Sequence, residues 1–164
     1  MVDTISELSE LARKLNQKSD KINTLISSIN DQLSTLNLGV EVWLDYPLVE
    51  GDAVISEDGN GKVISQRRNV TLLGFCKTEP GRWGLAVRDA IDIGLDDENY
   101  NFKNLETPLE LLRASRELRV VALNEIPGLL DAMKSRAEQL LKTIDAAEHT
   151  ADRLAGGDIP EKPR

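Results

Sequence analysis

The stretch LLGFCKTEPGRWGLAVRDA, residues 72–90, predicts a β-hairpin and decides how the rest of the chain is interpreted. Apolar and β-favouring residues alternate on both sides of Pro80 and Gly81, a pair that is typical of turns. With these two residues as the loop, the predicted cross-strand pairs are Glu79 with Arg82, Lys77 with Gly84, Phe75 with Ala86 and Leu73 with Arg88. Proline at the first loop position is not favoured in two-residue hairpins, and a slip of one residue would exchange the two faces of the hairpin.

This register gives the hairpin an apolar face and a basic face, because side chains alternate across a strand. The apolar face, which we assign to the core, contains Leu72, Cys76, Trp83, Leu85 and Val87. The other face places cations beside an aromatic ring, with Gly84 and Ala86 leaving room. Its candidate binding residues are Arg67, Phe75, Lys77 and Arg88. A shallow basic groove of this kind could bind a small anion or an acidic partner segment; an ordinary solvated sheet face is the alternative.

Further strands are expected before the hairpin. GVEVWLD at 39–45 alternates, and AVIS at 53–56 and KVISQ at 62–66 flank the turn signal EDGNG. Sequential strands joined by short turns predict an antiparallel β-meander of about four strands. Residues 92–104 show no period and are interpreted as a loop.

The N-terminal segment predicts one helix over 4–37. Thr4 and Glu7 form a capping box, and Gly39 provides a stop signal. The apolar residues with helical spacing are Leu8, Leu11, Leu15, Ile22, Ile26, Ile29, Leu33 and Leu36.

The C-terminal segment also predicts helix, from a cap at Thr107 and a first helical residue at Pro108. A first helix is expected over 108–123 and a long one over 126–155. Pro127 either kinks one helix or separates two. Residues 156–164 are interpreted as a disordered tail.

The apolar runs 8–36 and 126–154 have the same length, which predicts that they pair. The expected fold is therefore α+β: a long antiparallel two-helix stalk with an inserted β-meander head over 38–125. Extra apolar residues beside the main stripes, such as Leu25 and Leu141, widen the apolar arc toward that of a bundle helix. We therefore expect a homodimer in which two stalks form a four-helix bundle.

Composition narrows the function classes. The 164 residues carry a net charge of -8, which argues against a nucleic-acid binder. No stretch approaches the roughly 20 apolar residues of a membrane span, so no membrane partner is expected. The single cysteine, Cys76, and the absence of a visible signal peptide lead us to expect a cytoplasmic protein.

No motif points to catalysis or to a cofactor. The acidic run Asp89, Asp92, Asp96, Asp97, Glu98 does not follow the EF-hand pattern, so we expect a solvated loop and no metal site. The only histidine, His149, has no partner ligand in sequence and is expected on the surface. We expect a non-enzymatic interaction or assembly protein that presents a sheet surface to a protein partner. An anion-binding sensor using the basic groove is the alternative, and an enzyme is the least favoured class.

Overall fold

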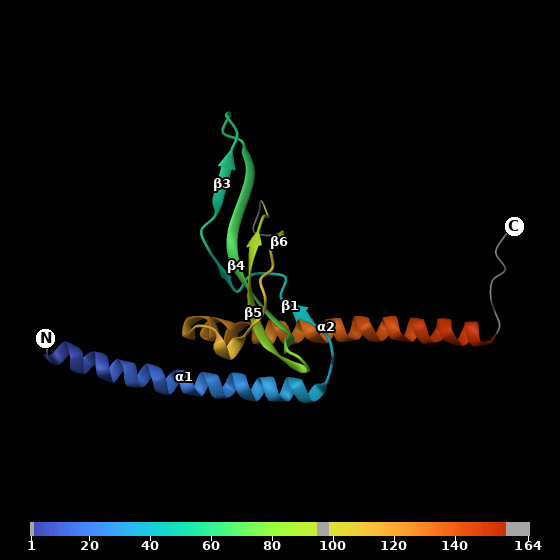
Figure 1. Ribbon diagram of the computed structural model, residues 1–164, viewed down its shortest axis with the longest axis horizontal. Helices are drawn as coiled ribbons and strands as arrows, with labels where there is room; N and C mark the ends of the chain where they lie inside the picture. Colours follow the sequence, from blue (N-terminus) through green and yellow to red (C-terminus); the bar gives the residue numbers. More distant parts are fainter. Residues whose placement is uncertain (1, 95–98, 157–164) are drawn as a thin grey trace.

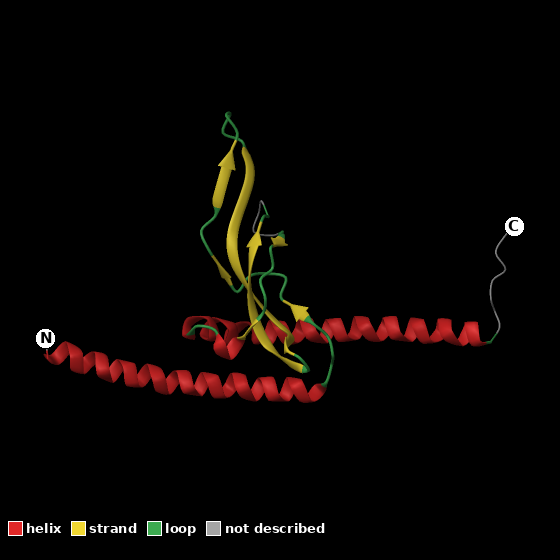
Figure 2. Cartoon of the chain, in the orientation of Figure 1, coloured by secondary structure: helices red, strands yellow, loops and turns green. Residues whose placement is uncertain are grey.

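A computed structural model describes residues 2–94 and 99–156 of the chain. Two long helices at the ends of the sequence flank an antiparallel sheet, so the α+β class is confirmed (Figures 1 and 2). The first helix, α1, spans Val2–Leu36, and the last, α2, spans Arg116–Ala155. No helix in the described ranges is long and apolar enough to cross a membrane.

The sheet is built on two long strands, β4 (Val63–Glu79) and β5 (Arg82–Asp92). β4 pairs with three short strands that precede it, and β5 with two that follow it. These short strands are β1 (Val42–Trp43), β2 (Val49–Glu50), β3 (Val54–Glu57), β6 (Phe102–Lys103) and β7 (Leu109–Glu110). The segments 62–66 and 69–77, expected as separate strands, are thus one continuous strand.

The hairpin of β4 and β5 forms where expected, but its register is shifted. Glu79 faces Arg82 as predicted, and one extra residue then lies between Lys77 and Glu79, so that Lys77 pairs with Trp83 and not with Gly84. The cause is the turn. Pro80 cannot adopt the positive φ of the favoured two-residue hairpin turns, whereas Pro followed by Gly81 at φ +81° suits a type II turn. The bulge restores the pairing that this turn would otherwise misalign.

The shift moves two of the five predicted core residues to the other face. Leu73 pairs with Val87 and Phe75 with Leu85, and all four are buried on the face that meets the helices. Leu72 and Cys76, expected on the same face as Leu85, lie on the opposite face. The second face has a smaller core of Val70, Leu72 and Ala90, with Trp43 and Phe102 packed against it. Close packing is strict here, since a Cβ at Gly74 would collide with the Trp43 ring.

The two helices do not form the expected antiparallel stalk. Arg116, at the start of α2, donates a hydrogen bond to Asn16 Oδ1 at 2.9 Å. Leu36, at the end of α1, lies beside Leu141 of α2. The helices therefore run in the same direction, as the colours of Figure 1 show. The reason lies in the connection, because β7 and the 3₁₀ helix η1 (Leu111–Arg113) bring the chain back beside the middle of α1 before α2 begins.

Each helix also docks on the sheet and not only on its partner. In α1, Asn30 Oδ1 accepts a hydrogen bond from Leu85 N at 2.7 Å, and Ser34 Oγ donates to Trp83 O at 3.0 Å. The buried residues of α2 are Ala122, Ile126, Leu129 and Met133, and they belong to the same core as the hairpin.

The start of α2 differs from the predicted one. Residues 109–113 pair with β5 or form η1, and the helix begins at Arg116. Ser115 is its N-cap and accepts a hydrogen bond from Leu118 N at 3.2 Å. Burial of Leu111 in the core outweighs the local capping signal at Thr107. Pro127 lies inside α2, which is continuous to Ala155. In the predicted tail, only Gly156 lies within the described residues.

Candidate functional site

The predicted basic groove does not bring its four residues to one face. Phe75 is 2% exposed, lies under the helices and stacks on Trp83 with ring centroids 5.8 Å apart. Lys77 is on the same face, and its ammonium lies 5.8 Å from the centroid of the Trp83 ring. Phe75 is therefore a core residue, and Lys77 covers an aromatic ring at the edge of that core.

The other two predicted residues lie elsewhere. Arg88 is on the opposite face of the sheet, and its guanidinium stacks 3.8 Å over the Trp43 ring. Burial lowers the pKa of Arg88 from its usual value. Arg67 is exposed and pairs with Val54, far along β4 from the hairpin turn. The groove depended on the predicted register, and the bulge near the turn removes its geometry.

The most prominent surface features are instead the halves of the two long helices that project from the body. We define the α1 overhang as residues 3–15 and the α2 overhang as residues 140–155. Figure 1 shows them extending from opposite ends of the molecule, one to each side of the sheet. At 1.5 Å per residue each is roughly 20 Å long. Every described side chain in both overhangs is exposed.

The α1 overhang carries an apolar stripe that no other part of residues 2–94 and 99–156 covers. Apolar residues recur with a seven-residue spacing along α1. One series is Ile5, Ala12, Ile26 and Leu33, interrupted by Ser19, and the other is Leu8, Leu15, Ile22, Ile29 and Leu36. In the packed half, Ile26 of the first series is fully buried. In the overhang both series are exposed, and the large side chains Ile5, Leu8 and Leu15, with Leu11 beside them, are 52 to 63% exposed. The sequence pattern is thus continuous across a boundary at which the packing stops.

The α2 overhang repeats this arrangement at the other end. Its exposed aliphatic residues are Leu140, Leu141, Ile144 and Leu154. Leu140 and Leu154 continue the seven-residue spacing of Ile126 and Met133, which are buried, and Leu141 and Ile144 widen this stripe. An apolar groove of about 310 Å³ lies where α1 ends against α2, and it leads onto the overhang through Leu141. It is lined by Leu33, Leu36, Leu38, Leu130, Met133, Ala137 and Leu141, with Lys134 and Glu138 at its edge.

A second projection is the ribbon of β3 and β4, which we call the arm (residues 51–67). Its apolar side chains Val54, Ile55, Val63 and Ile64 are all exposed. The turn at its tip is the one expected from EDGNG: Asp58 Oδ1 accepts hydrogen bonds from Asn60 N and Lys62 N, both at 2.9 Å. The arm therefore has ordered backbone structure without a core of its own.

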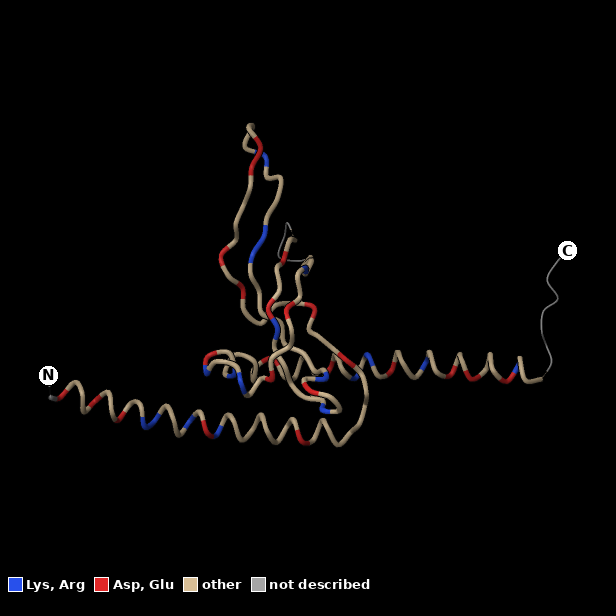
Figure 3. Tube along the Cα trace, viewed as in Figure 1, with Lys and Arg blue, Asp and Glu red and all other residues tan. Residues whose placement is uncertain are grey.

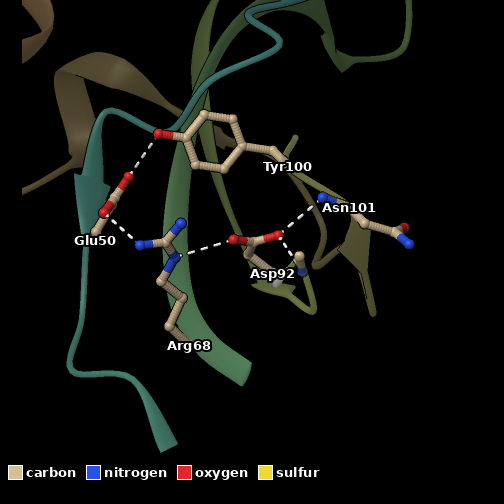
Figure 4. Close-up of polar contacts among 6 residues, drawn as sticks. Glu50, Arg68, Asp92, Tyr100 and Asn101 are labelled. Atoms are coloured by element: carbon tan, nitrogen blue, oxygen red, sulfur yellow. Dashed lines mark hydrogen bonds and ion pairs between the residues drawn. The ribbon is translucent and has the colours of Figure 1, made fainter. Parts of the chain in front are cut away.

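A buried ion pair fixes the base of the arm (Figure 4). Arg68 Nε donates to Asp92 Oδ2 at 3.0 Å, and its Nη1 donates to Glu50 Oε2 at 2.9 Å. Tyr100 donates its hydroxyl to the other oxygen of Glu50 at 2.9 Å, and its ring lies 5.4 Å from the guanidinium carbon. Residues from β2, β4, β5 and the segment before β6 thus meet at one point.

Asp92 is held ionised in this cluster. Burial by itself would raise the pKa of Asp92, but hydrogen bonds from the backbone N–H groups of Asn101 and Gly94 and the contact with Arg68 outweigh it and lower the pKa. The expectation of a solvated Asp92 was therefore wrong. Arg68, Val70 and Leu72 are two residues apart along β4 and therefore lie on the same face of the sheet, where Val70 and Leu72 are buried. This alternation was the sequence signal for a buried Arg68. Asp96, Asp97 and Glu98 of the acidic run lie outside the described residues.

The described part of the chain offers little for catalysis. Burial raises the pKa of the Cys76 thiol to about 11, which leaves it unreactive near neutral pH. His149 is exposed, as expected. Among the residues that the structure describes, no three His, Cys, Asp or Glu side chains could hold a metal ion together. A groove over β2, β4 and β5 contains Thr71 and Asp89, but Thr71 Oγ1 donates to Asp89 Oδ1 at 2.7 Å and has no histidine beside it.

Comparisons of the chain with known protein families, with curated protein sequences and with solved structures gave no match.

Proposed function

We propose that this chain is a non-enzymatic assembly protein that associates with copies of itself through the two overhangs. The observation that carries the proposal is the exposed apolar stripe on each overhang, which extends the spacing of residues that are buried in the rest of each helix, such as Ile26 in α1 and Met133 in α2. Helices of this length are marginal in water without packing of an apolar face. A contiguous exposed apolar surface of this kind commonly marks a contact site.

The proposal replaces the internal stalk by a contact between chains. Among the described residues, the helices pack only where the sheet lies beside them, and no other described segment covers the apolar stripes of the overhangs. A second copy provides the same spacing of leucine and isoleucine residues and can cover them as in a coiled coil. Because the stripes are short, we expect association that depends on concentration, with a dimer as its first step.

The arm is the surface that the assembly would present to a different protein. It projects from the sheet away from both helices (Figure 2), and the buried Arg68–Asp92 pair holds its base. A two-stranded ribbon with exposed backbone edges and aliphatic side chains suits a protein partner that adds a strand. A single, buried, unreactive Cys76 suits a reducing compartment, and we place the protein in the cytoplasm on that basis.

Light scattering tests the proposal with two double variants of the α1 overhang. Leu8→Glu/Leu15→Glu places charges in the apolar stripe, and Ser6→Glu/Gln17→Glu places them on the polar face of the same helix. We expect the wild-type mass to rise with concentration between about 1 µM and about 100 µM, the stripe variant to stay at the mass of one chain, and the control to behave as wild type. A wild-type protein that keeps the mass of one chain throughout would overturn the proposal.

A further inference from the structure

We propose that the copies associate head to tail: the α1 overhang of one chain binds the α2 overhang of the next, with the two helices parallel. This inference rests on the proposed self-association and adds which surfaces meet and in which direction. The occupant of each bare stripe is therefore a named segment of a second copy.

The position of the overhangs favours unlike surfaces in contact. They extend from opposite ends of the molecule, as Figure 1 shows. A two-fold contact through the α1 overhang alone would pair it with its own copy and leave Leu141 and Ile144 of α2 exposed. A two-fold contact through α2 would leave Leu8 and Leu15 exposed. Contact between α1 of one copy and α2 of the next covers both stripes with a single type of interface.

Acidic and basic residues are interspersed along both overhangs (Figure 3). By helical spacing, Glu7, Glu10 and Lys142 lie on faces away from the apolar stripes, and Glu10 Oε1 already pairs with Lys14 Nζ of its own helix at 2.9 Å. These charges keep the outer faces of the overhangs hydrated and do not set the direction of the contact.

The direction of the contact follows from the fold. α1 and α2 run parallel within a chain, and a second α1 that continues along α2 beyond Leu36 keeps this direction.

The apolar groove at the end of α1 gives the incoming helix a place to start. Its exposed members Leu36, Leu38 and Leu141 lie just where α1 of the same chain ends and α2 continues alone. Ile5 and Leu8 of the next copy would fill this groove, and Leu11 and Leu15 would follow along the α2 overhang. In such a contact, the first copy keeps a free overhang of one kind and the last copy keeps a free overhang of the other kind. Further copies can bind to these free overhangs, so the assembly extends into a filament or closes into a ring.

Mixing two variants tests the arrangement. Leu8→Glu/Leu15→Glu disables the α1 stripe, and Leu141→Glu/Ile144→Glu disables the α2 stripe. All four side chains are exposed, so the fold should persist, which circular dichroism checks for each variant. Alone, each variant is expected to have the mass of one chain. Mixed in equal amounts, they retain one intact α1 stripe and one intact α2 stripe, and we expect the mass of two chains and nothing larger.

The outcomes separate this inference from the proposed function. If the wild type associates but one variant alone still associates as well as wild type, the contact is two-fold through the other overhang and the head-to-tail arrangement is wrong. If the mixture stays monomeric, the two overhangs do not bind each other. A monomeric wild type contradicts the proposed function itself.

Discussion

Replacing Asp92 by asparagine tests the buried cluster at the base of the arm. The Asp92 side chain is fully buried and Arg68 is 8% exposed, so the variant leaves a guanidinium in the interior without its main counter-charge. Removing one partner of a buried pair costs about 3 to 5 kcal/mol. We expect the lower end, about 3 kcal/mol, because Glu50 still contacts Arg68 and an asparagine oxygen still accepts hydrogen bonds from the Gly94 and Asn101 N–H groups.

Urea unfolding at a fixed chain concentration measures this loss. With a slope of about 2 kcal/mol per molar urea, a loss of about 3 kcal/mol lowers the midpoint by about 1.5 M at pH 7. Asp89→Asn is the matched control on the same strand. Asp89 is exposed and its carboxylate contacts only a hydroxyl, so its midpoint should move by far less.

The pH dependence gives a second readout. The pKa of Asp92 is lower in the folded than in the unfolded chain, so its stabilising contribution is complete above the unfolded pKa of about 3.9 and is lost as the pH falls through the folded pKa. The stability difference between wild type and Asp92→Asn should therefore be constant from pH 5 to 7 and shrink below about pH 4. A variant as stable as wild type at pH 7, or a difference unchanged at pH 3, would refute the reasoning.

Three further predictions address the packing. Ile26→Ala should lower the free energy of unfolding in urea by about 2 to 5 kcal/mol. The chemically identical change Ile5→Ala should lower it by less than about 1 kcal/mol in the monomer. Equal effects would contradict the division of α1 into a packed part and an exposed part. Gly74→Ala should strongly lower the melting temperature because the new methyl group meets an indole ring, and Gly59→Ala, which meets nothing, should leave it nearly unchanged. The Cys76 thiol should react with a thiol reagent at pH 8 only as fast as the protein unfolds, and rapid labelling in native buffer would contradict its burial.

The local elements of this fold were largely predictable, because they depend on neighbouring residues. The EDGNG turn, the hairpin around Pro80 and the N-terminal helix all formed where the sequence indicated them. The hairpin register was wrong because the turn type chosen by Pro80 and Gly81 requires a bulge, and the pattern of apolar residues does not specify which residue is extra.

The arrangement of the helices could not be predicted from local sequence patterns. An apolar stripe indicates that a helix packs, but it does not say on what or in which direction. The equal runs 8–36 and 126–154 suggested a pair within the chain, whereas half of each stripe is bare. The candidate groove failed for a related reason: Phe75 and Arg88 share a face only in the unshifted register. The Arg68–Asp92 pair was missed because Asp92 was considered with the acidic loop that follows it and not with the strand that contains it.

The central claim is that the overhangs of α1 and α2 are contact surfaces between copies. Hydrogen exchange at two protein concentrations tests this claim most directly. A projecting helix without packing opens easily, so amides in residues 3–15 and 140–155 should exchange quickly at about 1 µM, while those of β4 and β5 exchange slowly. At about 100 µM we expect protection to increase in both overhangs and to stay unchanged in the sheet. Exchange in the overhangs that is equally fast at both concentrations, in a protein that is otherwise folded, would contradict the account.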